Sequence, residues 1–194
     1  MKLIRWLYDW LIKVSSSENA LIILFFISFI ESSFFPIPPD VMIIPMVLAA
    51  PKKAWRIAGI ATFASVVGGY FGYGIGLWGY EAIARPILDF YGYIDQFEVF
   101  KGYYNEWGVW IVFIGGITPF PYKVITIASG AVHLDMVVFG IASVFARGAR
   151  FFLIAWLLKK YGEPIRVFID KHLGILTILF TIILIGSFVL IKYL

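Results

Sequence analysis

Five charged residues lie inside long apolar stretches of this sequence: Glu31, Asp40, Lys123, Arg147 and Arg150. A charge at the centre of a bilayer costs about 2.5–3.5 kcal/mol on insertion scales, and residues retained at that cost usually serve a function. Carboxylates accept protons when burial raises their pKa, whereas arginine stays charged and can bind phosphate through two parallel hydrogen bonds. The set therefore combines candidate proton-coupling residues, Glu31 and Asp40, with candidate phosphate-binding residues, Lys123, Arg147 and Arg150.

Each of these residues also has a simpler interpretation. Asp40 follows a proline turn, so its side chain could cap the start of a helix. Asp40 and Lys123 could form an ion pair that neutralises both charges. Arg147 and Arg150 are close enough in sequence to share a helix face, and they could reach the membrane surface or pair with Glu31 and Asp40. These alternatives stay open from the sequence.

The composition is typical of an integral membrane protein. Hydrophobic residues make up 61% of the 194 residues, and the mean hydropathy is +0.91, whereas soluble domains are about 45–50% apolar. The run from Leu173 to Ile191 matches the ~20 residues needed to cross a bilayer. The chain has no cysteine, which excludes disulfides, thiolate catalysis and cysteine-ligated metals. Lys and Arg are scattered between apolar segments, which indicates topology rather than a nucleic-acid partner.

The alternation of apolar and polar stretches predicts a single all-α membrane domain. Its expected parts are an amphipathic N-terminal helix at 1–17, a hairpin at 20–50, a transmembrane helix at 54–80, an extracytoplasmic linker at 81–106, a second hairpin at 107–132, a transmembrane helix at 136–158 and a C-terminal transmembrane helix at 173–192. The N-terminal part lacks an uninterrupted apolar core and a small-residue cleavage site, so we interpret it as an interfacial helix rather than a signal peptide.

Prolines interrupt both expected hairpins: Pro36, Pro38 and Pro39 in the first, and Pro119 and Pro121 in the second. Proline removes a backbone donor and disfavours helix in the residue before it. Each half is then too short to span, and broken backbone at membrane depth is tolerated only where protein buries it or water lines it. We therefore expect two re-entrant hairpins, with proline-kinked transmembrane helices as the alternative.

The distribution of charge agrees with re-entrant hairpins. If 20–50 enters and returns on one side, the basic residues of the N-terminus, those near Lys52 and those after 158 all face the cytoplasm, as the positive-inside rule requires. The stretch 81–106 then lies outside, where it carries five acidic and two basic residues. This topology places the protein in the inner, cytoplasmic membrane as a multi-pass protein with a cytoplasmic N-terminus.

The two hairpins form an expected inverted repeat. An offset of 83 residues superposes Pro36 on Pro119 and Asp40 on Lys123. Inverted repeats with broken helices are the architecture of many secondary transporters, which bind substrate near the middle of the membrane. The glycines from Gly68 to Gly76 follow no strand, so close helix packing explains them better than a nucleotide-binding loop. His133 and His172 are isolated, which argues against a metal site.

Four motifs resemble the DedA family, also called SNARE-associated or VTT-domain proteins, and in particular its short YqaA-like branch. They are Phe29-Ile-Glu-Ser-Ser-Phe-Phe-Pro-Ile-Pro-Pro-Asp40, the glycine run from Gly68 to Gly76, Thr118-Pro-Phe-Pro-Tyr-Lys123 and Ala146-Arg-Gly-Ala-Arg-Phe151. The resemblance implies two facing re-entrant hairpins and movement of lipids such as undecaprenyl phosphate that depends on proton motive force. It matches Glu31 and Asp40 to the family's membrane acidic pair and makes Arg147 and Arg150 candidates for its essential arginines. Many members carry Arg-x-x-Pro-x-x-Arg at the second hairpin, where this chain has a single lysine, Lys123.

The leading hypothesis is a flippase for an anionic, phosphate-bearing lipid, driven by protons and needing no cofactor or metal. Its partners would be the lipid and protons, with no nucleic acid, and a homo-oligomer is compatible with the sequence. A proton or cation antiporter is the first alternative, in which the basic residues only balance charge. A membrane lipid phosphatase is the second, although we expect no enzyme because neither histidine lies in an apolar segment's centre.

Overall fold

The computed structural model describes residues 17, 19–33, 38–118, 120–162 and 164, and the regular elements within these ranges are all helical. The N-terminal helix expected at 1–17 lies outside the described residues except for Ser17. The transmembrane helix expected at 173–192 lies outside them as well, as do Pro36 and Pro119.

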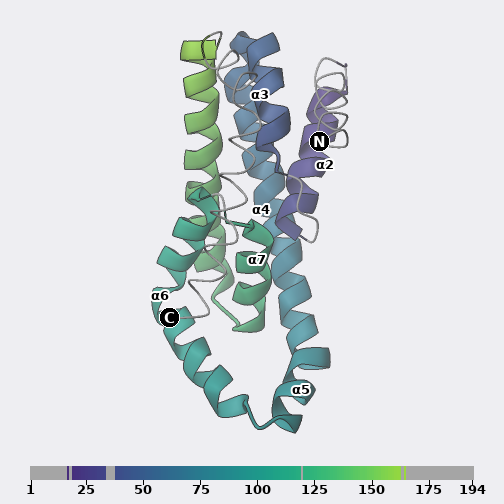
Figure 1. Cartoon of the computed structure of the whole chain (residues 1–194), viewed down its shortest axis with the longest axis vertical. Helices are drawn as coiled ribbons and strands as arrows, with labels where there is room; N and C mark the ends of the chain where they lie inside the picture. Colours follow the sequence, from purple (N-terminus) through teal and green to yellow (C-terminus); the bar gives the residue numbers. More distant parts are fainter. Residues whose placement is uncertain (1–16, 18, 34–37, 119, 163, 165–194) are drawn as a thin grey trace.

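The described elements follow one another as α-helices joined by short turns (Figure 1). They are α2 (Ala20–Ser33), α3 (Asp40–Ala49), the 3-10 turn η1 (Pro51–Lys53), α4 (Ala54–Gly79), the π-helical turn η2 (Tyr80–Ala84), α5 (Arg85–Phe90), α6 (Ile94–Ile117), α7 (Tyr122–Ala131) and the Met136–Gly162 helix.

Two of these helical stretches are long and apolar enough to cross a membrane. Pro51–Phe90 is continuous over 40 residues and Met136–Gly162 over 27 residues, compared with the ~20 that a bilayer requires. By contrast, α2, α3 and α7 contain 14, 10 and 10 residues, and ten residues of helix extend only ~15 Å. The described chain is therefore all-helical with two candidate membrane-spanning helices and several short helices packed between them.

Prolines mark the ends of the short helices. Pro38 and Pro39 stand immediately before α3, and Pro121 stands immediately before α7. α6 ends at Ile117, and Thr118 after it has an extended backbone with φ −79° and ψ 165°. Since residues before a proline are pushed out of the helical region, the sequence of prolines explains why two helix–break–helix units form. The first unit is α2 with α3, and the second is α6 with α7.

The stretch expected to be a linker at 81–106 is instead mostly helical. The spanning helix continues through η2 and α5 to Phe90, and α6 begins at Ile94, well before the boundary expected at 107. Aromatic packing accounts for this extension, because the rings of Tyr80 and Phe97 stack with their centroids 4.6 Å apart across the turn. The acidic residues of the stretch lie on the exposed side of these helices.

The two units approach the middle of the molecule from opposite ends. In Figure 1 the first unit occupies the upper half and the second the lower half, so the two breaks lie at mid-height, and α4 runs alongside both. The glycine run of α4 makes this contact close. A Cβ on Gly68 would lie 2.2 Å from the carbonyl oxygen of Phe29 in α2, and one on Gly76 would lie 1.9 Å from that of Ile127 in α7. The packing interpretation of these glycines is thereby confirmed.

The interior contains two apolar clusters with a polar layer between them. The first cluster joins α2, α3, the start of α4 and the end of the Met136–Gly162 helix. The second joins the end of α4, α6, α7 and the start of the Met136–Gly162 helix. Between them lie buried polar side chains, which are Ser28, Glu31, Ser32, Ser33, Ser65, Thr126, Ser143 and Arg147, whereas Ser129 is hydrogen-bonded to Tyr104 of the second cluster.

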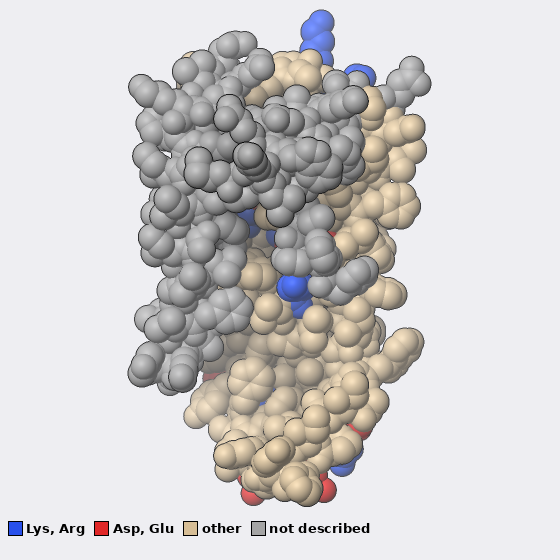
Figure 2. Space-filling view, turned by 45° about the vertical axis from the view of Figure 1, so that its right-hand side comes forward, with Lys and Arg blue, Asp and Glu red and all other residues tan. Residues whose placement is uncertain are grey.

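The two ends of the molecule differ in charge. Figure 2 shows Lys and Arg side chains at the upper end, and Asp and Glu side chains with some Lys or Arg beside them at the lower end. The exposed basic residues Lys52 and Lys53 at the start of α4 lie at the same end as Lys159 and Lys160 at the close of the Met136–Gly162 helix. Lys159 Nζ lies 5.2 Å from the ring centre of Trp55, which is two residues after Lys53, so the two basic clusters are neighbours.

Candidate functional site

The centre of the polar layer is an ion pair between Arg147 and Glu31. Arg147 Nη2 donates to Glu31 Oε2 over 2.7 Å, and the two side chains are only 2% and 10% exposed. Arg147 Nε donates to the hydroxyl of Ser65 at 2.6 Å. Ser32 Oγ lies 2.7 Å from Ser65 Oγ and donates to the same Glu31 oxygen at 3.1 Å. Side chains of three helices therefore form a closed ring of hydrogen bonds that includes the ion pair.

Aromatic rings hold the Arg147 guanidinium in place. Its Cζ lies 4.9 Å from the ring centre of Tyr122 and 4.6 Å from that of Phe151, which is the geometry of cation–π contact. Tyr122 donates its hydroxyl to Ser143 Oγ at 2.5 Å, and Ser143 donates onward to the carbonyl of Phe139 at 2.6 Å. Because Tyr122 is the first residue of α7, the second helix–break–helix unit helps to fix an arginine of the spanning helix.

A second ion pair lies one helical turn away. Arg150 Nη2 donates to Asp40 Oδ2 at the start of α3, and Arg150 Nη1 donates to the carbonyl of Thr118 after α6. One guanidinium thus bridges the breaks of both units. These side chains are 16% and 18% exposed, and Asp40 Oδ1 is buried with no hydrogen-bond partner among the described residues. The second pair is therefore more open and less fully satisfied than the first.

The start of α7 also contacts the end of α2. Thr126 Oγ1 lies 3.0 Å from the carbonyl oxygen of Ser32 and 2.9 Å from that of Lys123, and it can donate to either. Lys123 lies in the first turn of α7 and is half-buried. A candidate phosphate-binding lysine therefore stands close to the junction where the two units meet.

The structure brings four of the five predicted charged residues into two pairs. The alternative interpretation, in which Arg147 and Arg150 pair with Glu31 and Asp40, is the arrangement observed. Pro38, Pro39 and Pro121 lie at the breaks as expected, whereas Pro36 and Pro119 lie outside the described residues.

Sequence reasoning missed the neutral residues that complete the site: Ser65, Tyr122, Ser143 and the carbonyl of Thr118. A buried serine in the apolar face of α4 was the available signal for Ser65, because a hydroxyl inside a spanning helix needs a partner. Nothing in the sequence pattern marks the Thr118 carbonyl.

The described part of the chain contains no group of three or more His, Asp or Glu side chains that could hold a metal ion. His133 lies far from the ion pairs in sequence, with a left-handed backbone (φ 57°), and its Nε2 is 3.9 Å from Glu81 Oε1. His172 lies outside the described residues.

Fold and site together define an all-helical protein with two candidate membrane-spanning helices and a buried layer of two arginine–carboxylate pairs. No protein-family model matches the chain, and no solved structure matches it. It is 38% identical over 176 residues to an uncharacterized protein of Haemophilus influenzae, with 91% of each chain covered. It is 37% identical over 174 residues to an uncharacterized protein of Histophilus somni, covering 88% of this chain and 91% of the other. The chain belongs to the family of these bacterial proteins.

Proposed function

We propose that this protein is a transporter of the DedA type that moves an anionic, phosphate-bearing lipid such as undecaprenyl phosphate across the inner membrane, coupled to the proton motive force. The observation that carries the proposal is the pairing of each buried arginine with a carboxylate, above all Arg150 with Asp40 at the junction of the two breaks. An arginine fork fits a phosphate group as well as it fits a carboxylate.

Charge balance links phosphate binding to protons in this site. With Asp40 ionised and paired, a lipid phosphate that approaches Arg150 adds an uncompensated negative charge to an interior of low dielectric, which is costly. If Asp40 takes up a proton, its attraction for Arg150 falls and the guanidinium can turn to the phosphate. The proton and the lipid anion then enter together, and the charge of the site is unchanged. On the opposite side, loss of the proton restores the ion pair and displaces the lipid.

The two ion pairs have different roles in this proposal. Glu31 and Arg147 are nearly inaccessible, and hydrogen bonds join them to each other and to Ser32 and Ser65, so they hold the units together. Asp40 has one buried oxygen without a partner among the described residues, and its pair is more exposed, so it exchanges protons. Lys123, at the start of α7, supplies a second cation for the phosphate.

The fold supports a matching topology. The two helix–break–helix units would enter the bilayer from opposite faces as re-entrant hairpins, with their breaks near the midplane. The end of the molecule that carries Lys52, Lys53, Lys159 and Lys160 would face the cytoplasm. The protein would then be multi-pass, with broken backbone only where neighbouring helices bury it.

Transport in reconstituted vesicles tests the proposal. Purified protein in liposomes should move a fluorescent polyprenyl phosphate between leaflets when a pH gradient is imposed, and Arg150→Gln should lose this activity. Asp89→Asn, an exposed change far from the ion pairs in sequence, is the matched control and should transport normally. Absence of gradient-driven lipid movement by folded wild-type protein would refute the proposal.

A proton or cation antiporter is a second candidate. One observation favours it, which is that both arginines are paired with carboxylates. If the arginines serve only to balance Glu31 and Asp40, they need not meet any phosphate. In that case Arg147→Ala and Arg150→Ala should retain cation-coupled proton movement in vesicles while Glu31→Gln abolishes it. This candidate would be excluded if Arg150→Gln loses lipid transport and no cation exchange is detected in the vesicles.

A further inference from the structure

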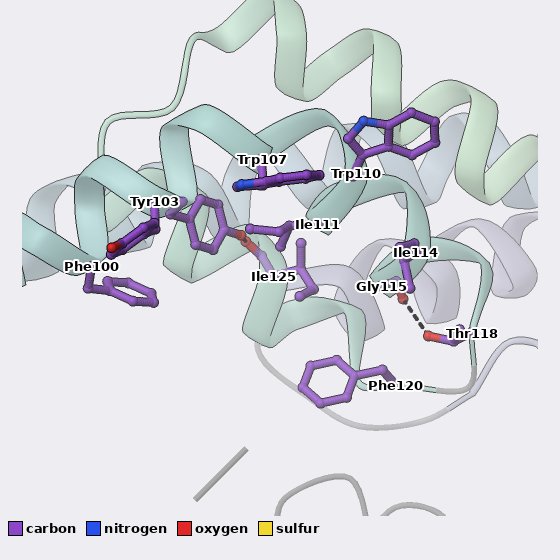
Figure 3. Close-up of a pocket in the computed structure, with 11 residues that line it drawn as sticks. Phe100, Tyr103, Trp107, Trp110, Ile111, Ile114, Gly115, Thr118, Phe120 and Ile125 are labelled. Atoms are coloured by element: carbon purple, nitrogen blue, oxygen red, sulfur yellow. Dashed lines mark hydrogen bonds between the residues drawn. The ribbon is translucent and has the colours of Figure 1, made fainter. Parts of the chain in front are cut away.

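An aromatic groove runs along one face of α6. It has a volume of about 570 Å³ and is shown in Figure 3. Its lining consists almost entirely of apolar and aromatic side chains, which are Phe100, Tyr103, Tyr104, Trp107, Trp110, Ile111, Ile114, Gly115, Thr118, Phe120 and Ile125. This volume lies within the ~300–1,000 Å³ range of small-molecule sites.

The groove is long and open along one side. The lining residues of α6 recur every three or four positions, so they form one stripe on the helix. From Phe100 to Thr118 the stripe extends ~27 Å at 1.5 Å per residue, close to the ~30 Å of a bilayer's hydrocarbon core. Large rings on this stripe are well exposed, with Tyr103 at 65%, Trp107 at 55% and Trp110 at 58%. Such a shape suits one extended hydrocarbon chain better than a compact ligand.

One end of the groove coincides with the ion-pair site. Thr118 lines the groove, and its carbonyl oxygen accepts a hydrogen bond from Arg150. Ile125 of α7 also lines the groove. The apolar stripe therefore leads to the Thr118 carbonyl, where Arg150 of the Asp40–Arg150 pair is bound. The opposite end, at Phe100, lies toward the acidic end of the molecule.

We infer that this groove binds the hydrocarbon chain of the lipid whose phosphate is held at the Thr118 end. The inference rests on the proposed function and adds to it the substrate's shape: a single long chain, such as a polyprenyl group, attached directly to a phosphate. The apolar groove would face the hydrocarbon chain, and Arg150 at its Thr118 end would face the phosphate. A second hollow of about 500 Å³ lies between α6 and the Met136–Gly162 helix, but none of its lining residues is polar or charged. It serves as the natural comparison for ordinary contact with bilayer lipid.

Photo-crosslinking tests where the chain lies. The photoreactive residue benzoylphenylalanine replaces Trp107, which lines the groove. In the matched control it replaces Val109, which lines the second hollow on the same helix. Each variant that folds like the wild type is placed in phosphatidylcholine vesicles, and radiolabelled polyprenyl phosphate is added. We expect the Trp107 position to capture the label about tenfold better than the Val109 position, and unlabelled polyprenyl phosphate to compete where polyprenol does not. Equal labelling at both positions, or no competition, would show ordinary bilayer contact and overturn the inference.

Filling the groove separates this inference from the proposed function. Ile114 lines the groove and is 55% exposed, so Ile114→Trp should obstruct the chain without disturbing a buried contact. We expect transport to fall about tenfold, while Val109→Trp keeps the wild-type rate. Transport by wild type together with full transport by a stably folded Ile114→Trp variant would reject the groove alone. No transport by wild type would reject the proposed function, and crosslinking would still decide whether the groove selects phosphate-bearing chains.

Discussion

Arg147 of the second spanning helix and Glu31 of α2 are 116 positions apart in sequence and meet over 2.7 Å, with side chains only 2% and 10% exposed. Their contact crosses α4, whose Ser65 accepts a hydrogen bond from the same guanidinium. Because both charges are withdrawn from solvent, each depends on the other for stability, and the pair reports on the assembly of the whole helical core.

Neutralising either partner of this pair should destabilise the protein strongly. Arg147→Met alone leaves Glu31 buried and unpaired, which typically costs about 3–5 kcal/mol. The double variant Glu31→Gln with Arg147→Met removes both charges and should recover most of the loss. Thermal unfolding in detergent, followed by intrinsic tryptophan fluorescence, measures both effects. Additive losses in the double variant would contradict the coupling of these two side chains.

Asp40→Asn should change transport more than stability. The Asp40–Arg150 pair is less buried than the Arg147–Glu31 pair, and the Thr118 carbonyl still binds Arg150 in the variant, so the change should cost less than the ~3–5 kcal/mol expected for the inner pair. Asparagine can still accept a hydrogen bond from Arg150 but cannot exchange a proton. We therefore expect a smaller fall in melting temperature than for Arg147→Met, and a lipid transport rate that no longer responds to an imposed pH gradient. A variant that keeps its full response to the gradient would show that Asp40 is not the coupling residue.

Ser65→Ala should be costly although it removes only one hydroxyl. The change leaves Arg147 Nε without its acceptor and removes one of the two partners of the Ser32 hydroxyl, and a buried unsatisfied polar group costs about 1–3 kcal/mol. Thr62→Ala on the same helix is the control, because the Thr62 hydroxyl donates to the carbonyl of Ala58 in its own helix. Equal melting temperatures for the two variants would argue against the hydrogen-bonded ring around Arg147.

Two glycines of the helix interfaces should not tolerate alanine. An added Cβ at Gly76 would lie 1.9 Å from the carbonyl oxygen of Ile127, and one at Gly130 would lie 1.9 Å from that of Tyr73. Backbone atoms cannot move aside cheaply, so each change should cost about 1–3 kcal/mol through forced separation of α4 and α7. Gly74→Ala meets no atom within 4 Å and should be neutral or stabilising. Thermal melting of the three variants measures the difference.

Single cysteines can test the topology, because the chain contains none. Lys53→Cys and Lys159→Cys lie at the basic end of the molecule, and Tyr91→Cys lies in the turn between α5 and α6. A membrane-impermeant maleimide should label Tyr91→Cys in spheroplasts with an intact inner membrane, and the other two only after that membrane is permeabilised. Labelling of all three in intact spheroplasts would contradict the proposed orientation.

Much of the architecture follows from local features of the sequence. The prolines before Asp40 and Tyr122 interrupt the two units locally, because the missing donor and the steric restriction act within a few residues. The expected all-helical class and the close packing at Gly68 and Gly76 are confirmed for the same reason, since both depend on residue type and spacing. The boundary at 107 was misplaced because acidic residues read as a linker, whereas aromatic stacking of Tyr80 on Phe97 supports helix on both sides of the turn.

The sequence by itself determined which residues are chemically unusual: Glu31, Asp40, Lys123, Arg147 and Arg150 stand out because charge is costly in apolar segments. Only the tertiary structure decided how they are used. The pairs join residues 116 and 110 positions apart, and the choice of partner depends on how α4 brings the two units together. Likewise, the stripe of rings on α6 is visible as spacing, but its meeting with Arg150 at Thr118 requires the fold, because a backbone carbonyl leaves no mark in the sequence.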